Sequence, residues 1–511
     1  MKFIRKILFS HIIVVVLAIL LQFVFLLNML LFFKAYSPAF YGFSVLLSAL
    51  VVLWIVYSDR NPAYKIAWII PIMLMPIFGG IFYLAFGGNT LSRKEKNRMK
   101  KIGVTSKENL KPNEKIIEDI RKRSPIAANQ ATYIQNYAFF PPYENTFSEY
   151  YPIGEKKFES LIQELEKAEK FIFMEYFIIE EGKMWNTILD VLVRKAAQGV
   201  DVRVIYDDLG CMLTLPYRYS DKLESMGIKC CVFNPLVPVL SVKFNTRDHR
   251  KITVIDGHTA FTGGINIADE YINEIVKHGH WKDMGIMIKG EAVWNFTVMF
   301  LTLWDSLKKT DSNHESYKVS VDMPDEVRSK GYVQPFSDNP LDNEPVGQIV
   351  YLNMINKAQK YVYITTPYLI IDSEMITALS TAAKSGVDVR IITPHHADKK
   401  YVHETTRSFY PKLLQSGVRI FEYEPGFMHG KTFVSDDECA VVGTINMDYR
   451  SLFLHFECGL WMYGTDSVID VRKDFNSTLN DCLEVSLDHF NNVSLGRRLF
   501  SLILRLFAPL M

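Results

Sequence analysis

The fold of this chain is decided by the stretch HRKITVIDGHTAFTGGIN at residues 249–266, because the stretch returns as HGKTFVSDDECAVVGTIN at residues 429–446. Among the residues that are identical between the two copies, six carry the pattern, and each pair is separated by 180 positions: His249 and His429, Lys251 and Lys431, Asp256 and Asp436, Gly263 and Gly443, Ile265 and Ile445, and Asn266 and Asn446. Six identities at one shared spacing are not a chance match. The sequence therefore contains an internal duplication.

The duplication extends upstream of these stretches. GVDVRVI at residues 199–205 matches GVDVRII at residues 386–392, and FIFMEYFII at residues 171–179 resembles YVYITTPYLI at residues 361–370. Each unit alternates short β-branched or aromatic runs with helix-length segments, which is the pattern of α/β layers. With only two copies of this length, the pattern predicts two similar α/β lobes, since a solenoid would stack more and shorter units.

The repeated residues carry side chains that phosphoryl transfer requires. In an extended strand the side chains at i and i+2 share a face, so each His-x-Lys presents an imidazole beside an ammonium group. Asp256-Gly257 is a hairpin turn signal, which ends a strand predicted over residues 249–255. If the lobes pack as a pseudo-dimer, two His and two Lys converge on one cleft.

Such a cleft has the groups for a two-step transfer. Fixed cations and Asn amide donors stabilise the equatorial phosphoryl oxygens. One His can attack phosphorus while the other, protonated, gives its proton to the leaving alkoxide, so the two imidazoles form a coupled titration. This chemistry needs no metal, and we expect neither a metal ion nor another cofactor.

Both copies fit the HKD motif, H-x-K-x4-D-x6-G-[GST]-x-N, and on these residues the chain resembles the phospholipase D superfamily. NPAYKIAW at residues 61–68 and Phe86-Gly87-Gly88 resemble the membrane prelude of bacterial cardiolipin synthases. The resemblance covers nearly the whole chain. It implies an α/β fold in which two similar phospholipase D-type lobes, each a mixed sheet flanked by helices, form a pseudo-dimer preceded by transmembrane helices.

The resemblance also implies a reaction and its site residues. In bacterial cardiolipin synthases two phosphatidylglycerol molecules give cardiolipin and glycerol through a phosphohistidine intermediate. Carried over residue by residue, the catalytic set is His249, Lys251, Asp256, His429, Lys431 and Asp436, and Asn266 and Asn446 join the lysines in binding the substrate phosphate. By analogy His249 is the nucleophile and His429 the acid/base.

Four carboxylates in this assignment have an alternative role. Asp283 and Glu457 lie where related enzymes place a carboxylate that orients each His, or else they serve as surface or strand-pairing residues. Asp256 and Asp436 are either catalytic or turn-forming. A phospholipase D or a phosphatidylserine-type synthase would use the same chemistry with another acceptor, and a membrane-tethered HKD nuclease is the alternative from a different class.

The charge of the chain is divided unevenly. Residues 1–125 carry 18 Lys and Arg against 6 Asp and Glu, a balance of +12, so the remaining 386 residues carry −11 of the total net charge of +1. An acidic body is a poor electrostatic match for a phosphate backbone, which argues against nucleic acid as a partner. The expected partners are phospholipid substrates, phosphatidylglycerol foremost, and a membrane; the sequence leaves the oligomeric state open.

Three apolar runs near the amino terminus predict a multi-pass cell-membrane protein. They cover residues 7–33, 40–57 and 66–86, and the first exceeds the roughly 20 residues that cross a bilayer. By the positive-inside rule, the basic cluster at residues 93–101 puts the lobes in the cytoplasm. Lys2, Arg5 and Lys6 would lie inside too, which three full spans do not allow, so the number of spans stays open.

These signals divide the chain into six parts. Membrane segments occupy residues 1–90, a basic linker 91–130, the first HKD lobe 131–307, a connector 308–330, the second HKD lobe 331–492 and an amphipathic basic tail 493–511. The tail carries Arg497, Arg498 and Arg505 in an otherwise apolar helix, which is expected either at the bilayer interface or docked on the body.

The two copies differ in ways that bear on the site. The first reads Gly263-Gly264 where the second reads Gly443-Thr444, so one hydroxyl is missing from the first lobe. The segment 234–245 is an insertion that is either an apolar lip or an ordinary loop. Asp207-Asp208 resembles a magnesium site but has no counterpart in the second copy, and the six cysteines show no metal-binding spacing, so we expect no metal site.

Overall fold

The computed structural model describes residues 104–235, 245–321, 330–342, 344–491 and 495–510, together with 38–58, 61–75 and scattered positions among the first 103 residues. Most of the expected span over 7–33, the basic cluster at 93–101 and most of the insertion at 234–245 lie outside the described residues, as do the side chains of Arg497 and Arg498. In the part of the chain that is described, no helix has both the length and the apolar character of a membrane span.

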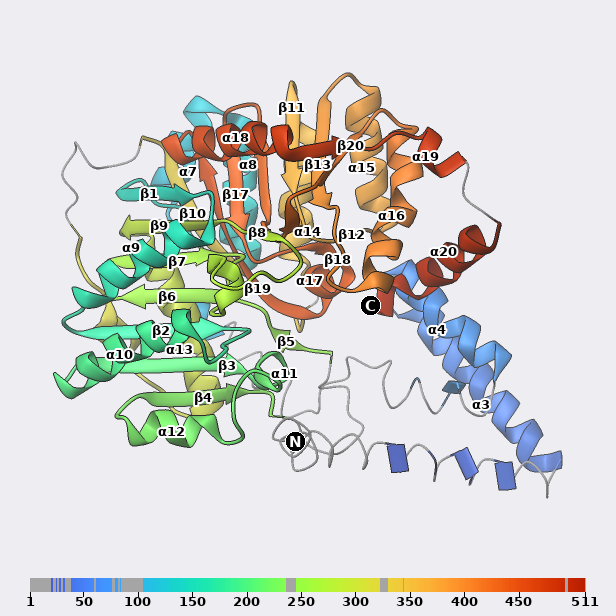
Figure 1. Cartoon of the computed structure of the whole chain (residues 1–511), viewed down its shortest axis with the longest axis horizontal. Helices are drawn as coiled ribbons and strands as arrows, with labels where there is room; N and C mark the ends of the chain where they lie inside the picture. Colours follow the sequence, from blue (N-terminus) through green and yellow to red (C-terminus); the bar gives the residue numbers. More distant parts are fainter. Residues whose placement is uncertain are drawn as a thin grey trace.

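The body contains two large mixed sheets with the same strand order (Figure 1). The first runs β1 (Thr146–Tyr151), β9 (Gly285–Gly290), β7 (Thr259–Gly263), β6 (Lys251–Ile255), β2 (Phe171–Tyr176), β3 (Asp201–Asp207) and β4 (Lys229–Phe233). The second runs β10 (Tyr332–Asp338), β19 (His455–Tyr463), β17 (Cys439–Gly443), β16 (Thr432–Ser435), β11 (Tyr361–Thr365), β13 (Asp388–Pro394), β14 (Arg419–Tyr423) and β20 (Cys482–Glu484). In the first sheet β2, β3 and β4 pair in parallel, and in the second sheet β11, β13 and β14 do the same. The other neighbouring strands of each sheet pair antiparallel. The structure confirms the predicted α/β class and its mixed sheets.

The turn signals act as predicted. Asp256 and Gly257 both have positive φ, at 51° and 72°, and are the central residues of the turn in the three-residue loop that joins β6 to β7. Asp436 and Asp437 do the same between β16 and β17, at 56° and 61°. Positive φ at both central positions is the geometry of the turn that suits the right-handed twist of a hairpin, and Asp tolerates it better than most residues.

Two apolar layers cover the first sheet. One face packs on α9 (Gly154–Glu166) and α10 (Lys183–Ala197), and Ile172, Met174 and Ile255 point into that layer. The other face packs on α13 (Val293–Lys308), a helix buried along almost its whole length. This second layer is continuous with the core of the second sheet, which α14 (Val346–Lys357) and α15 (Ser373–Lys384) also cover. The two halves therefore share one core.

Short strands also pair across the two halves. β5 (Arg247–Asp248) pairs in parallel with β19, and β8 (His280–Lys282) pairs in parallel with β15 (Gly426–Met428). Each exchanged strand directly precedes a repeated histidine or a predicted carboxylate. The strands that pair across the two halves thus lie directly beside the repeated histidines and Asp283.

The amino-terminal helices and the carboxyl-terminal helix lie together beside the second sheet (Figure 1). α3 (Pro38–Tyr57) and α4 (Pro62–Leu74) form an arm, and α20 (Leu495–Phe507) lies against α4 and α16 (Lys400–Leu414). The side chain of Asn61 caps α4 and donates a hydrogen bond of 2.9 Å to Asp372 at the start of α15. The arm is therefore attached to the second half of the body.

Candidate active site

The two repeated histidines lie between strands, where the chain changes its pairing partner. His249 follows β5, which pairs with the second half, and precedes β6, which pairs within the first sheet. Its backbone N–H donates to Phe456 O at 2.9 Å, and that of His429 donates to Lys282 O at 2.8 Å. The prediction of one strand over residues 249–255 is wrong at its amino end, because the backbone before Lys251 bonds to the other half.

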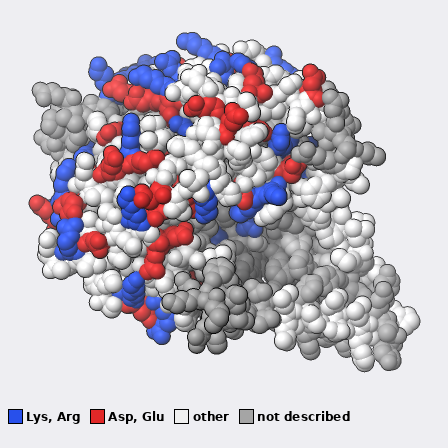
Figure 2. Space-filling model, in the orientation of Figure 1, with Lys and Arg blue, Asp and Glu red and all other residues white. Residues whose placement is uncertain are grey.

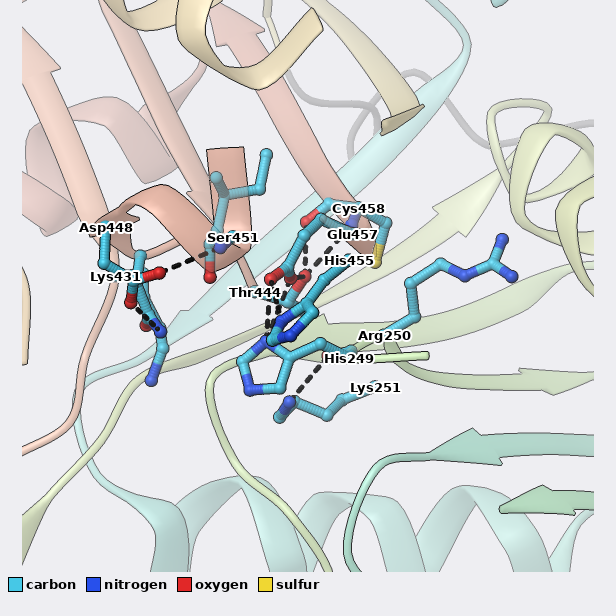
Figure 3. A network of polar contacts seen from close by, with 12 residues as sticks. His249, Arg250, Lys251, Lys431, Thr444, Asp448, Ser451, His455, Glu457 and Cys458 are labelled. Carbon is cyan, nitrogen blue, oxygen red and sulfur yellow. Dashed lines mark hydrogen bonds and ion pairs between the residues drawn. The ribbon is translucent and has the colours of Figure 1, made fainter. Parts of the chain in front are cut away.

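Each histidine is hydrogen-bonded to a carboxylate from the opposite half. His429 Nδ1 lies 2.6 Å from Asp283 Oδ2. His249 Nδ1 lies 2.9 and 3.0 Å from the two oxygens of Glu457, and Figure 3 shows this second pair. Both carboxylates are fully buried. An ionised carboxylate only accepts hydrogen bonds, so each Nδ1 carries the proton and each Nε2 keeps its lone pair.

Lys251 and Lys431 lie beside the histidines and are themselves buried. Lys251 Nζ donates to His249 O at 2.6 Å, and Lys431 Nζ donates to His429 O and lies 2.8 Å from His429 Nδ1. Burial lowers the pKa of Lys251 to about 8 and that of Lys431 to about 7. Two poorly hydrated ammonium groups facing one space favour an anion between them.

The pKa values of both histidines and of one carboxylate are shifted as well. Burial, followed by the neighbouring lysines, lowers the pKa of both His249 and His429 well below the usual histidine value. Burial raises the pKa of Asp283 to about 6, although Lys431 opposes this shift. The lysine of the other repeat also lowers the pKa of each histidine. The two histidines and the two lysines therefore share one electrostatic environment.

Asp256 and Asp436 lie away from this cluster, at the far ends of β6 and β16. The carboxylate of Asp256 accepts hydrogen bonds of 2.7 to 2.8 Å from the backbone N–H groups of residues 169, 170 and 171. Asp436 accepts from residues 359, 360 and 361 at 2.7 to 2.9 Å. Both aspartates therefore fix the turns and the loops before β2 and β11, which is the turn-forming role that the sequence analysis offered beside the catalytic one.

Asn266 and Asn446 differ in their surroundings although the repeat makes them equivalent. Asn266 Oδ1 accepts from Ile178 N at 3.1 Å, and its Nδ2 donates to Tyr271 OH at 2.7 Å. Asn446 Nδ2 donates to Asp448 at 3.0 Å, whereas its Oδ1 is buried without a hydrogen-bond partner. Each Nδ2 carries two N–H donors, so one donor of each amide is still available for the expected phosphate contact.

The difference between Gly264 and Thr444 matches the difference between the two carboxylates. Thr444 Oγ1 donates to Glu457 Oε2 at 2.5 Å. A Cβ at Gly264 would lie 2.1 Å from Asp283 Oδ1. Because an aspartate is one carbon shorter, its carboxylate lies closer to the backbone and occupies the space that the threonine side chain fills in the other half.

Rings surround the two histidines unequally. His429 has Tyr271, Trp281 and Phe427 around it, with ring centroids 5.4, 5.6 and 5.9 Å away. His249 has Phe177 at 5.1 Å and His455 at 5.7 Å. The sequence reasoning missed His455, which precedes Glu457 by two residues as Trp281 precedes Asp283. Aligning the two carboxylates would have revealed this pair.

Two further buried charged side chains were not predicted from the sequence. Lys157 of α9 is almost fully buried near Asp283, and burial lowers its pKa to about 8. Arg250 Nε lies 2.7 Å from Glu175 and 3.1 Å from Asp248 beneath His249. Asp207, considered above as a magnesium ligand, instead caps α11 (Asp208–Cys211) and accepts from the N–H of Asp248 at 3.1 Å. Only the folded chain brings these groups together.

Comparison with known proteins agrees with this arrangement. A family model described as "Cardiolipin synthase, PLD-like domain" matches residues 161–304 and 351–479, and a second, "Phospholipase_D-nuclease N-terminal", matches residues 46–88. The chain is 44% identical to an uncharacterised protein of Streptococcus mutans, over 90% of this chain and 99% of that one. It is 35% identical to a cardiolipin synthase of Geobacillus kaustophilus, over 92% of this chain and 94% of that one.

A solved structure shares the fold. The phosphatidylserine synthase of Haemophilus influenzae superimposes with a TM-score of 0.58 at 16% identity, over 75% of this chain and 97% of that one. With two family matches, the curated relatives and the duplicated histidine sites in agreement, the chain belongs to the phospholipase D-like cardiolipin synthase family, a family of phosphatidyltransferases.

Proposed function

We propose that this enzyme transfers a phosphatidyl group from one phosphatidylglycerol molecule to a second, giving cardiolipin and glycerol. The observation that carries the proposal is the pair of buried histidines, each hydrogen-bonded through Nδ1 to a carboxylate of the opposite half and each flanked by a buried lysine. Relatives of similar length that are named cardiolipin synthases support the choice of substrate.

In the first step the Nε2 lone pair of one histidine attacks phosphorus, and a P–N bond forms as the bond from phosphorus to the glycerol oxygen breaks. The other histidine, protonated, gives its proton to that oxygen, so glycerol leaves neutral. By the family analogy His249 is the nucleophile and His429 the acid. Lys251, Lys431 and the free N–H groups of Asn266 and Asn446 stabilise the charge on the phosphoryl oxygens.

In the second step the headgroup hydroxyl of another phosphatidylglycerol attacks the same phosphorus. His429, now neutral, accepts the hydroxyl proton, the P–N bond breaks and cardiolipin forms. Substrate binding favours the required protonation, because a phosphate between the lysines raises the depressed pKa values of both lysines and of the acid histidine. The residues supply the positive charge themselves, so we expect turnover without a divalent metal.

Water would compete with the lipid hydroxyl for the intermediate, so the cleft must be dry and close to the bilayer. Figure 2 shows acidic and basic side chains interspersed over the body, whereas the visible face of the α3–α4 arm carries almost none. On α20, Arg505 stacks on Phe409 of the body while Leu499 and Leu502 stay exposed. These features support a membrane-associated enzyme, with the tail both docked and facing the lipid.

The test is purified full-length protein in vesicles that contain phosphatidylglycerol alone, with lipid products and free glycerol both measured. We expect cardiolipin and glycerol in equal amounts, and nearly no product from His249→Ala or His429→Ala, with a double variant little worse than either one. Phosphatidic acid as the main product would identify a phospholipase D instead. Transfer only when another alcohol, such as serine, is added would identify a different acceptor.

A further inference from the structure

A third side chain with metal-ligand chemistry lies against the His249–Glu457 pair. His455 is two residues before Glu457 at the start of β19, and its Nδ1 lies 3.8 Å from Glu457 Oε1. His249 Nδ1 lies 2.9 Å from that same oxygen. The ligand atoms of the three residues all lie within 4.8 Å of one another, and Figure 3 shows the two imidazoles converging on the carboxylate from the two halves of the chain.

His455 is the member of this group that the proposed reaction does not use. Both of its ring nitrogens are buried, and neither has a hydrogen-bond partner among the residues that the structure describes. A buried polar group without a partner costs free energy, and in native proteins such a group usually faces a bound water, ion or ligand.

We propose that His249, His455 and Glu457 form an inhibitory site for a zinc-like divalent ion. Two imidazoles and one glutamate are a donor set that zinc adopts in proteins, with a further position left for water or substrate. Tetrahedral bonds of about 2.0–2.1 Å place ligand atoms roughly 3.3 Å apart. Glu457 Oε1 lies 2.9 Å from His249 Nδ1 and 3.8 Å from His455 Nδ1, so one separation is shorter and the other longer than this value. Small side-chain rotations would therefore complete the site.

The ion would inhibit by fixing the wrong tautomer of His249. At present the Nδ1 proton is held by Glu457 and the Nε2 lone pair is free. A metal on Nδ1 binds through the lone pair of Nδ1, so the single proton of the neutral ring must be on Nε2. His249 then has no lone pair for phosphorus and no removable proton at ordinary pH, whichever role it has in the cycle. This inhibitory effect rests on the proposed function, whereas the binding does not.

The opposite half lacks the third ligand. There Trp281 occupies the place of His455 beside the His429–Asp283 pair, with its ring centroid 5.6 Å from that of His429. An indole N–H is a donor only and does not bind a cation. The proposal therefore predicts one ion per chain at this cleft and assigns it to the His249 side.

The binding test uses the purified full-length protein without lipid and two probes, Zn²⁺ by calorimetry and Co²⁺ by its visible absorption. We expect one site that weakens by about tenfold or more in both His455→Asn and His455→Phe. His280→Asn is the matched control, because His280 also begins a short strand paired to the opposite half and its ring nitrogens contact Tyr423 and Asn273. Affinity unchanged in a folded His455 variant would overturn the proposal.

The activity test compares inhibition of each variant with its own metal-free rate. Zn²⁺ should inhibit the wild-type enzyme reversibly, with excess EDTA restoring the rate, and the inhibitory concentration should rise by about tenfold or more in His455→Asn but not in His280→Asn. Inhibition equal in both variants would place the ion elsewhere and overturn the proposal. Zn²⁺ binding that depends on His455 in a protein without phosphatidyl transfer would instead refute the proposed function and leave the site standing.

Discussion

At the scale of single residues, the two halves of the cleft are equivalent in chemistry and unequal in detail. Both histidines have a buried carboxylate on Nδ1, but Glu457 is held by a threonine hydroxyl and Asp283 by a backbone N–H, from Met284 at 2.8 Å. The missing hydroxyl at Gly264 is thus compensated by the shorter acid. The side chain at position 444 or 264 thus matches the length of the carboxylate that it contacts.

This matching gives a prediction for Thr444 and Gly264. Thr444→Ala removes a hydrogen bond to a buried charged group, which is worth roughly 1.5–3 kcal/mol, so we expect a loss of about 10- to 100-fold in the transfer rate with the fold retained. Gly264→Thr, the reciprocal change, should be more damaging because its Cβ would overlap Asp283. Lipid product formation and thermal melting of both variants check this. Full activity in Thr444→Ala would show that Glu457 needs no support.

The pH dependence follows from Asp283 and Lys431. The pKa of Asp283 is raised to about 6, so as the pH falls through 6 its carboxylate gains a proton and no longer accepts from His429. The pKa of Lys431 is lowered to about 7, so as the pH rises through 7 it loses the charge that binds phosphate. We expect kcat/KM to form a narrow bell with limbs near these values, and kcat to fall at higher pH than kcat/KM, because bound phosphate raises the lysine pKa.

Asp283→Asn gives the control for the acid limb. The amide cannot be ionised, so the variant should be less active and should lose the fall in kcat/KM below pH 6. The alkaline limb should remain. A profile whose acid limb is unchanged in this variant would assign that limb to another group.

At the scale of secondary-structure elements, the aspartate of each HKD motif belongs to a hairpin. Each carboxylate receives three backbone N–H groups from the loop before the neighbouring strand, so it joins β6 to β2 in one half and β16 to β11 in the other. The donor N–H groups are buried to different degrees. Phe171 N is buried with Asp256, whereas the N–H groups of residues 359 and 360 are exposed to solvent beside Asp436.

We therefore predict a difference in stability between the two aspartates. Asp256→Ala should lower the free energy of unfolding by roughly 2–4 kcal/mol, and Asp436→Ala by less, since water can replace the lost acceptor there. Chemical denaturation in detergent measures both. The specific activity of the folded fraction should be retained. A variant with normal stability and no activity would restore the aspartate to the catalytic set.

At the scale of the whole molecule, each histidine–carboxylate pair needs both halves. His249 takes its carboxylate from the second half and His429 takes its carboxylate from the first, and a partly buried ion pair of 2.8 Å between Lys282 and Asp474 also joins the halves. One chain thus contains two complete pairs. The shared core around α13 fixes their relative position.

Mixing experiments test whether one chain is a complete unit. His249→Ala and His429→Ala proteins, combined in detergent and reconstituted together, should give no more activity than their sum, because neither chain contains two intact pairs. A tandem protein that carries one variant in each copy should be equally inactive. Recovery of a substantial part of the wild-type rate in the mixture would show that halves exchange between chains and that the working cleft forms across a dimer.

The sequence by itself determined the duplication, the α/β class, the hairpin turns and the identities of the histidines, lysines and carboxylates of the cleft. Those features are local: they depend on residue spacing, turn chemistry and the 180-residue repeat. Only the tertiary structure decided that the carboxylates are exchanged between halves, that Asp256 and Asp436 serve the backbone, and that His455 faces Glu457. Strand pairing between segments 146 and 208 residues apart brings the carboxylates to the histidines, and no local pattern encodes which segment is the partner.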